Sequence, residues 1–129
     1  LSMVVPSLAV TMSLGPAYAG LFSNDDDWAD TVMRASDASG EPLWHMPLDP
    51  AYRKMIDGVY ADIRNTASKR VAGASTAAEF LHHFAGDEIP WAHLDIAGVA
   101  DDVDLPYARK GGAGFGVRLL VNLAESLCS

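Results

Sequence analysis

The chain has 129 residues, half of them apolar, which is enough for a core and for one domain at most. Its formal net charge of −8, with no run of Lys or Arg, argues against nucleic acid, because phosphates require a basic surface. The single cysteine, Cys128, cannot form an internal disulfide, which suits a reducing compartment.

The N-terminal segment, residues 1–24, carries no charged side chain and has three competing interpretations. An Ala-Tyr-Ala run ending at Ala19 is similar to a signal-peptide cleavage site, although no basic region precedes the apolar run. A transmembrane helix would need about 20 apolar residues, and Pro6 and Pro16 interrupt the run. We therefore favour the third interpretation, a core segment of a longer protein, and expect no membrane partner.

The first half of the chain predicts two helices and a strand between them. Residues 7–14 are typical of a short buried helix, and residues 18–22 of a buried strand. Residues 27–39 have helical apolar spacing, with an N-cap supplied by residues 23–25 (Ser-Asn-Asp) and Gly40 as the C-terminal stop. This order favours an α/β arrangement.

The middle of the chain is less regular. Residues 41–50 contain three prolines and predict an extended connection, while residues 51–58 predict a helix. Residues 59–63 fit either a helix or a strand, and the polar residues 64–71 predict a loop.

The strand around which the chain is organised follows a helix of small residues over 72–84. Residues 91–96 form an apolar run bounded by proline and glycine, which predicts a strand buried on both faces. A long irregular connection, residues 100–116, then leads to an apolar helix over 115–127. Since ligands of open α/β sheets sit beyond the carboxyl ends of strands, we expect any substrate contact at residues 97–100.

Two segments have ligand-binding interpretations that we consider weaker than structural ones. The glycine cluster over residues 111–116 precedes a helix, as in phosphate loops, but no strand leads into it and the P-loop lysine motif is missing. We interpret it as the entry to the last helix. Asp101, Asp102 and Asp104 could hold a hard cation, but a solvated acidic loop is the better interpretation because EF-hand spacing is absent.

The histidines do not predict a metal site. His82 and His83 are adjacent on a predicted helix and so point about 100° apart, which leaves one of them facing solvent. His93 lies in the predicted strand and is expected to be a hydrogen-bonded core residue. The sequence contains no HExxH, CxxC or Walker motif, so no catalytic set is evident from the residues alone.

Four blocks of sequence together resemble one family. Residues 19–25 read Ala-Gly-Leu-Phe-Ser-Asn-Asp, and residues 91–98 read Trp-Ala-His-Leu-Asp-Ile-Ala-Gly. Residues 72–81 and 110–118 complete the pattern in the same order. The similarity extends over residues 15–127 and identifies the C-terminal part of the leucyl aminopeptidase catalytic domain.

This resemblance implies an α/β fold, part of a mixed β-sheet flanked by helices, with residues 1–129 forming a single and incomplete domain. It implies a cytoplasmic homohexamer whose partners are peptides with an N-terminal leucine or similar apolar residue. It also implies a metallopeptidase in which two divalent metals, manganese or zinc, polarise the scissile carbonyl and activate a bridging water.

The same resemblance shows what the sequence lacks. The family's metal ligands and catalytic residues lie in motifs that do not occur here, so we expect this chain alone to bind no metal and to be inactive. Residues 2–9 also depart from the family's substrate-contacting turn, because Pro6 removes an N–H donor and Leu8 adds bulk. Either the upstream sequence is altered or truncated, or the chain is a degenerate, non-catalytic paralogue that acts in assembly or interaction.

The substrate side of the site does carry over. The resemblance places Thr66, Ala97 and Ala100 on the pocket for the substrate's first side chain. Small residues at these positions leave room for a leucine side chain, whose burial is worth about 1.5–3 kcal/mol. The competing interpretation is that both alanines are ordinary packing residues.

Overall fold

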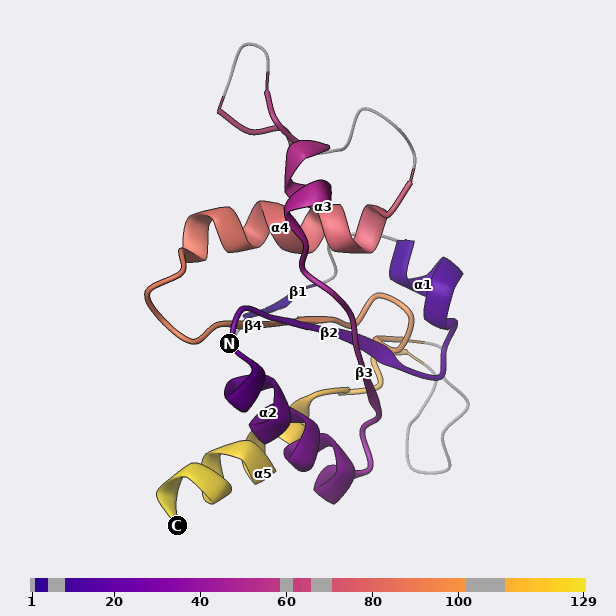
Figure 1. Cartoon of the computed structure of the whole chain (residues 1–129). Helices are drawn as coiled ribbons and strands as arrows, with labels where there is room; N and C mark the ends of the chain where they lie inside the picture. Colours follow the sequence, from indigo (N-terminus) through magenta and orange to yellow (C-terminus); the bar gives the residue numbers. More distant parts are fainter. Residues whose placement is uncertain (1, 5–8, 59–61, 66–70, 102–110) are drawn as a thin grey trace.

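The computed structural model describes residues 2–4, 9–58, 62–65, 71–101 and 111–129 (Figure 1). Within these ranges the chain forms, in order, β1 (Ser2–Val4), α1 (Ala9–Leu14), β2 (Ala19–Ser23), α2 (Asp26–Ser39), β3 (Leu43–His45), α3 (Pro50–Lys54), α4 (Gly73–Ala85), β4 (Ala92–Asp95) and α5 (Val117–Cys128). No helix in the described part is both long and apolar enough to cross a membrane.

The strands form one mixed sheet, as the resemblance predicts, and their order is β1-β4-β2-β3. β4 is parallel to β1 and antiparallel to β2, which in turn is parallel to β3. The register places Val4 beside Asp95 on one side of β4, and Gly20 beside Asp95 on the other. Because β1 and β4 are parallel, their carboxyl ends lie at the same edge of the sheet.

Helices cover both faces of this sheet and give three layers (Figure 1). The helices α2 and α5 lie on one face, and α1 and α4 lie on the other. Side chains alternate along each strand, so Leu21 and Leu94 point toward α2 and α5 while Phe22 points toward α1 and α4. The predicted strand buried on both faces is therefore confirmed, and all four residues of β4 are buried.

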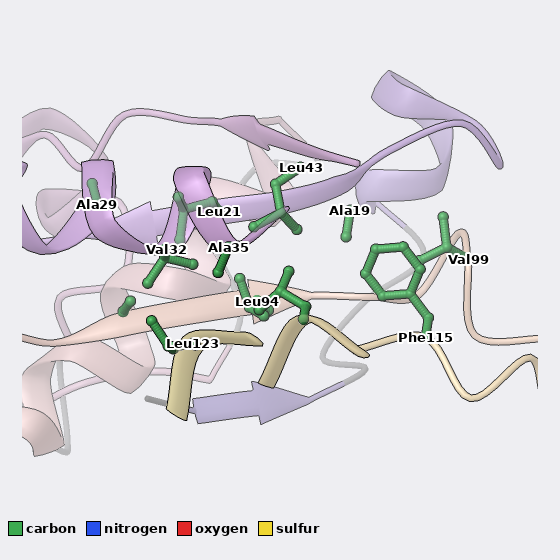
Figure 2. Packing of buried hydrophobic residues seen from close by; sticks show 12 residues of the cluster. Ala19, Leu21, Ala29, Val32, Ala35, Leu43, Leu94, Val99, Phe115 and Leu123 are labelled. Atoms are coloured by element: carbon green, nitrogen blue, oxygen red, sulfur yellow. The ribbon is translucent and has the colours of Figure 1, made fainter. Parts of the chain in front are cut away.

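The face covered by α2 and α5, here called the apolar face, is packed by apolar residues of the sheet, of the two helices and of the segments next to them. Figure 2 shows Val32 and Ala35 of α2 beside Leu21, and Phe115 beside Val99, with Leu94 near the centre. The buried members are Ala19, Leu21, Ala29, Val32, Ala35, Leu43, Ala92, Leu94, Val99, Phe115, Leu119 and Leu123.

The face covered by α1 and α4, here called the polar face, mixes aromatic and polar side chains. The His93 ring is stacked between Phe22, with ring centroids 6.1 Å apart, and Trp91, at 6.0 Å. The Trp91 ring also stacks on His82 of α4, at 5.2 Å. His93 is thus a buried core residue, as predicted from the sequence.

Capping explains why α2 begins and ends where the sequence predicts. The Asp25 side chain accepts a hydrogen bond from the N–H of Trp28 at 2.7 Å, which satisfies one free donor of the first turn. Gly40 adopts a left-handed conformation, with φ of 67°, and its N–H donates to the Ser36 carbonyl. Few residues other than glycine adopt this conformation without strain, so the helix stops here.

The extended connection predicted over residues 41–50 contains the strand β3, which was not predicted. Its pairing with β2 is flanked by bonds from the Ala19 N–H to the Pro42 carbonyl and from the Met46 N–H to the Leu21 carbonyl. The prolines lie just outside the paired residues, so the ladder loses no donor.

The helix predicted over residues 51–58 is shorter, since α3 ends at Lys54. The chain turns there and buries Ile56 completely, and the N–H of Arg64 donates to the Ile56 carbonyl at 2.7 Å. The strand β1 was not predicted from the sequence. The predictions over residues 59–61, 66–70 and 102–110 lie outside the described residues.

Candidate functional site at the carboxyl end of β4

The strand β4 ends in a turn that the sequence marked as the expected place of substrate contact. The Asp95 side chain accepts a hydrogen bond from the Ala97 N–H at 3.2 Å through Oδ1. One residue further on, the Val99 N–H donates to the Ile96 carbonyl at 3.0 Å. These two bonds close the chain into a compact turn, here called the pocket turn, over residues 95–100.

Gly98 allows the pocket turn to pack directly on the end of α1. A Cβ atom at this position would lie 2.2 Å from the carbonyl oxygen of Gly15 and 3.5 Å from Thr11 Oγ1. The first distance is shorter than any real Cβ contact, and the atom it meets belongs to the backbone. Glycine is therefore required here by the close approach of two chain segments.

The far end of the pocket turn is attached to the segment that enters α5. The Ala100 carbonyl accepts a hydrogen bond from the Ala113 N–H at 2.8 Å, and Asp101 forms an isolated bridge with Gly112. Val99 is buried in the core of the apolar face. The turn is thus held by α1 on one side and by the approach to α5 on the other.

Asp95 is the one group in the pocket turn with an unusual electrostatic environment. Its side chain is fully buried, and its Oδ2 atom has no hydrogen-bond partner among the residues that the structure describes. Burial raises the pKa of the Asp95 carboxyl to about 6, and the hydrogen bond from the Ala97 N–H acts in the opposite direction. The sequence signalled Asp95 only as one of two polar residues in an apolar strand.

The predicted pocket residues are only partly placed by the structure. Ala97 and Ala100 lie in the same turn and both are half-buried, while Thr66 lies outside the described residues. Ala97 packs against the buried residues of the polar face. Their contact with a substrate side chain stays a prediction.

Two cavities formed by described residues lie elsewhere. One of about 580 Å³ lies between α3, α4 and the end of β2, and one of about 290 Å³ lies between α1 and the start of α4. Neither is lined by Ala97 or Ala100. The larger cavity is bordered by the buried Glu79, whose Oε1 accepts the Asp49 N–H at 2.9 Å.

The glycine cluster enters α5, as predicted, and the first turn of that helix already holds an internal anion. Glu41 is buried, and its Oε2 accepts the Leu119 N–H at 2.8 Å. Its Oε1 lies 3.6 Å from the Arg118 Nε atom. A carboxylate of the chain itself therefore takes the position that a bound phosphate would take at this helix start.

The described residues bring together no group of three or more His, Cys, Asp or Glu side chains that could hold a metal ion. That the metal ligands of the family lie outside this chain stays a prediction. His83 is exposed and His82 half-buried, so the expectation that one of the pair faces solvent is confirmed. Asp102 and Asp104 lie outside the described residues, which leaves the acidic-loop prediction without a test.

A mixed sheet between two helical layers, with a site beyond the end of its central strand, defines a three-layer α/β protein. Residues 7–121 match the sequence model of the cytosol aminopeptidase family, catalytic domain, and the chain belongs to this family.

Relatives in several bacteria support the same assignment. The chain is 50% identical over 119 residues to a "Probable cytosol aminopeptidase" of Agrobacterium fabrum, covering 92% of this chain and 24% of that protein. It is 51% identical over 115 residues to a protein of the same description from Roseiflexus castenholzii, covering 88% of this chain and 23% of that protein. The chain thus spans about a quarter of the length of the curated relatives it matches.

Proposed function

We propose that this chain is the C-terminal portion of a leucyl aminopeptidase-like metallo-exopeptidase, which removes N-terminal residues from peptides. In this proposal the chain supplies the scaffold and the substrate pocket, and the metal ligands come from residues outside it. The single observation that carries the proposal is the family match over residues 7–121, which includes the whole pocket turn.

The geometry of the pocket turn supports a role in substrate binding. The turn follows the buried strand β4 at the edge where β1 also ends, which is where open α/β sheets place their ligands. Ala97 and Ala100 carry small side chains that leave space for a leucine-sized group. We propose that they line the pocket together with Thr66.

The remaining properties of the proposal follow from the family. The intact enzyme would use two divalent metals, manganese or zinc, and would act on peptides with an N-terminal leucine or similar residue. It would assemble as a cytoplasmic hexamer. Because the described residues hold no metal-binding group, we expect the isolated chain to show no turnover of leucine p-nitroanilide with manganese.

A chimeric enzyme tests the proposal directly. The matched segment of the Agrobacterium fabrum protein would be replaced by the corresponding 119 residues of this chain. We expect the chimera to hydrolyse leucine p-nitroanilide, because the host supplies the missing ligands. A folded chimera without activity would instead favour the alternative function, a degenerate paralogue that serves in assembly or interaction.

The pocket assignment has its own test in the same chimera. Replacing Ala100 by leucine should fill the pocket and lower kcat/KM for leucine p-nitroanilide by about tenfold or more, since overfilled pockets reject large side chains. Turnover of alanine p-nitroanilide should change much less. Ala85→Leu, at the end of α4, is the matched control.

A further inference from the structure

The geometry points to Asp95 as a positioning residue for the substrate pocket, whose carboxylate fixes the turn that presents Ala97 and Ala100. The inference rests on the proposed function, since it concerns the same pocket. Asp95 does not contact the substrate in this inference. It acts through the backbone of Ala97.

Burial of the Asp95 carboxylate lowers the stability of the fold. The Asp95 side chain has no exposed surface, and its Oδ2 atom has no hydrogen-bond partner among the described residues. A buried polar atom without a partner lowers stability, and native proteins contain few of them. Such an atom at the end of β4, beside the predicted pocket, indicates a role other than packing.

The two ends of the pocket turn are held by different contacts. Gly98 fits against Gly15, and Ala100 is held through its carbonyl by the Ala113 N–H. The Ala97 N–H, by contrast, is held by the Asp95 side chain. Removing the carboxylate would therefore release the end of the turn that carries Ala97 and leave the other end in place.

The elements around Asp95 differ in the titratable side chains that they carry. The elements β1, β2 and α1 carry no titratable side chain within their bounds. The titratable groups of the same face are His93 on β4 and Glu79, His82 and His83 on α4. Of these, His82 lies 3.9 Å from Glu79 and 3.1 Å from Asp87 and pairs with those carboxylates.

Two substitutions in the active chimera separate positioning from simple loss of stability. Asp95→Ala removes the acceptor for the Ala97 N–H, whereas Asp95→Asn keeps an oxygen at the same position. We expect Asp95→Ala to lower the ratio of kcat/KM for leucine over alanine p-nitroanilide by about tenfold, chiefly through KM. Asp95→Asn should restore most of this ratio.

Asp30→Ala changes an exposed acid on α2 and should leave the ratio unaltered. An active chimera in which Asp95→Ala lowers both substrates by one common factor would show a purely structural role and overturn the inference. A chimera without any activity would overturn the proposed function, and the inference with it, so the two failures can be told apart.

Discussion

The two faces of the sheet are packed by different kinds of side chain. The apolar face is closed by aliphatic residues of α2 and α5, whereas the polar face buries an aromatic stack together with His93 and Asp95. Each face also has a buried carboxylate. Both oxygens of Glu41 have partners, while among the residues that the structure describes only one oxygen of Asp95 does.

This difference indicates that the apolar face contributes packing alone. A carboxylate with complete partners joins two elements and adds to stability. A carboxylate with an unpaired oxygen lowers stability, and its presence is better explained by the turn it holds. The apolar face therefore stabilises the domain by packing, and the polar face adjoins the candidate site at the end of β4.

The largest expected effect comes from the apolar face. Leu94 is fully buried at the centre of its core, so Leu94→Ala should lower the free energy of unfolding by about 4 kcal/mol. Urea unfolding of the whole chain, followed by circular dichroism, measures the loss. Met12→Ala on the exposed side of α1 is the control and should change stability by less than about 0.5 kcal/mol. A loss at Leu94 no larger than the control would refute a tightly packed apolar face.

The next effect belongs to the polar face and depends on pH. The folded state raises the pKa of Asp95 to about 6 from an ordinary value of 3.8, so between these values the folded chain holds the proton more tightly than the unfolded chain. The contribution of Asp95 to stability is therefore fully present below pH 3.8 and is lost as pH rises through 6. The loss is about 3 kcal/mol.

Asp95→Asn isolates this effect, because an amide does not titrate. The difference in unfolding free energy between the unaltered chain and the variant should shift by that amount across the same pH range. Asp30→Asn, an exposed change on α2, should keep the pH dependence of the unaltered chain. If the unaltered chain and Asp95→Asn lose stability in parallel, the carboxyl at Asp95 is not the titrating group.

The contrast between the faces also separates what sequence patterns predict from what they miss. The helices α2, α4 and α5 and the strands β2 and β4 agree with their predictions within a few residues, because apolar spacing and caps are local signals. The strand β3 was missed since its pairing depends on the edge of β2. No pattern within residues 43–45 reveals that partner.

The candidate site divides in the same way. The turn after β4 was located from the order of helix, strand and glycine, and Ala97 and Ala100 were named from the family resemblance. The role that we propose for Asp95 was not predicted, because the hydrogen bonding of its two carboxyl oxygens is a property of the folded chain and follows no sequence pattern. Contacts between distant segments, such as Gly98 with Gly15, leave no periodic signal in the sequence.

A smaller effect tests the contact between the pocket turn and α1. Gly98→Ala would place a methyl group against the Gly15 carbonyl, so the segments must move apart at a cost of about 2 kcal/mol. Gly112→Ala is the matched control, since no atom lies within 4 Å of its Cβ position and its φ is not in the left-handed region. Thermal melting of both variants measures the difference. Equal melting temperatures would contradict the close approach.

The smallest effect concerns Glu41, the buried carboxylate of the apolar face. Glu41→Gln keeps an acceptor for the Leu119 N–H but removes the charge that favours the start of α5 and the ion pair with Arg118, so stability should fall by about 1 kcal/mol. Glu125→Gln, an exposed change on α5, should have almost no effect. Because Glu41 has partners for both oxygens and Asp95 has a described partner for only one, the two amide substitutions should act with opposite sign at pH 7. A gain in stability from Glu41→Gln would remove the distinction between the two buried carboxylates and leave the polar face without its separate role.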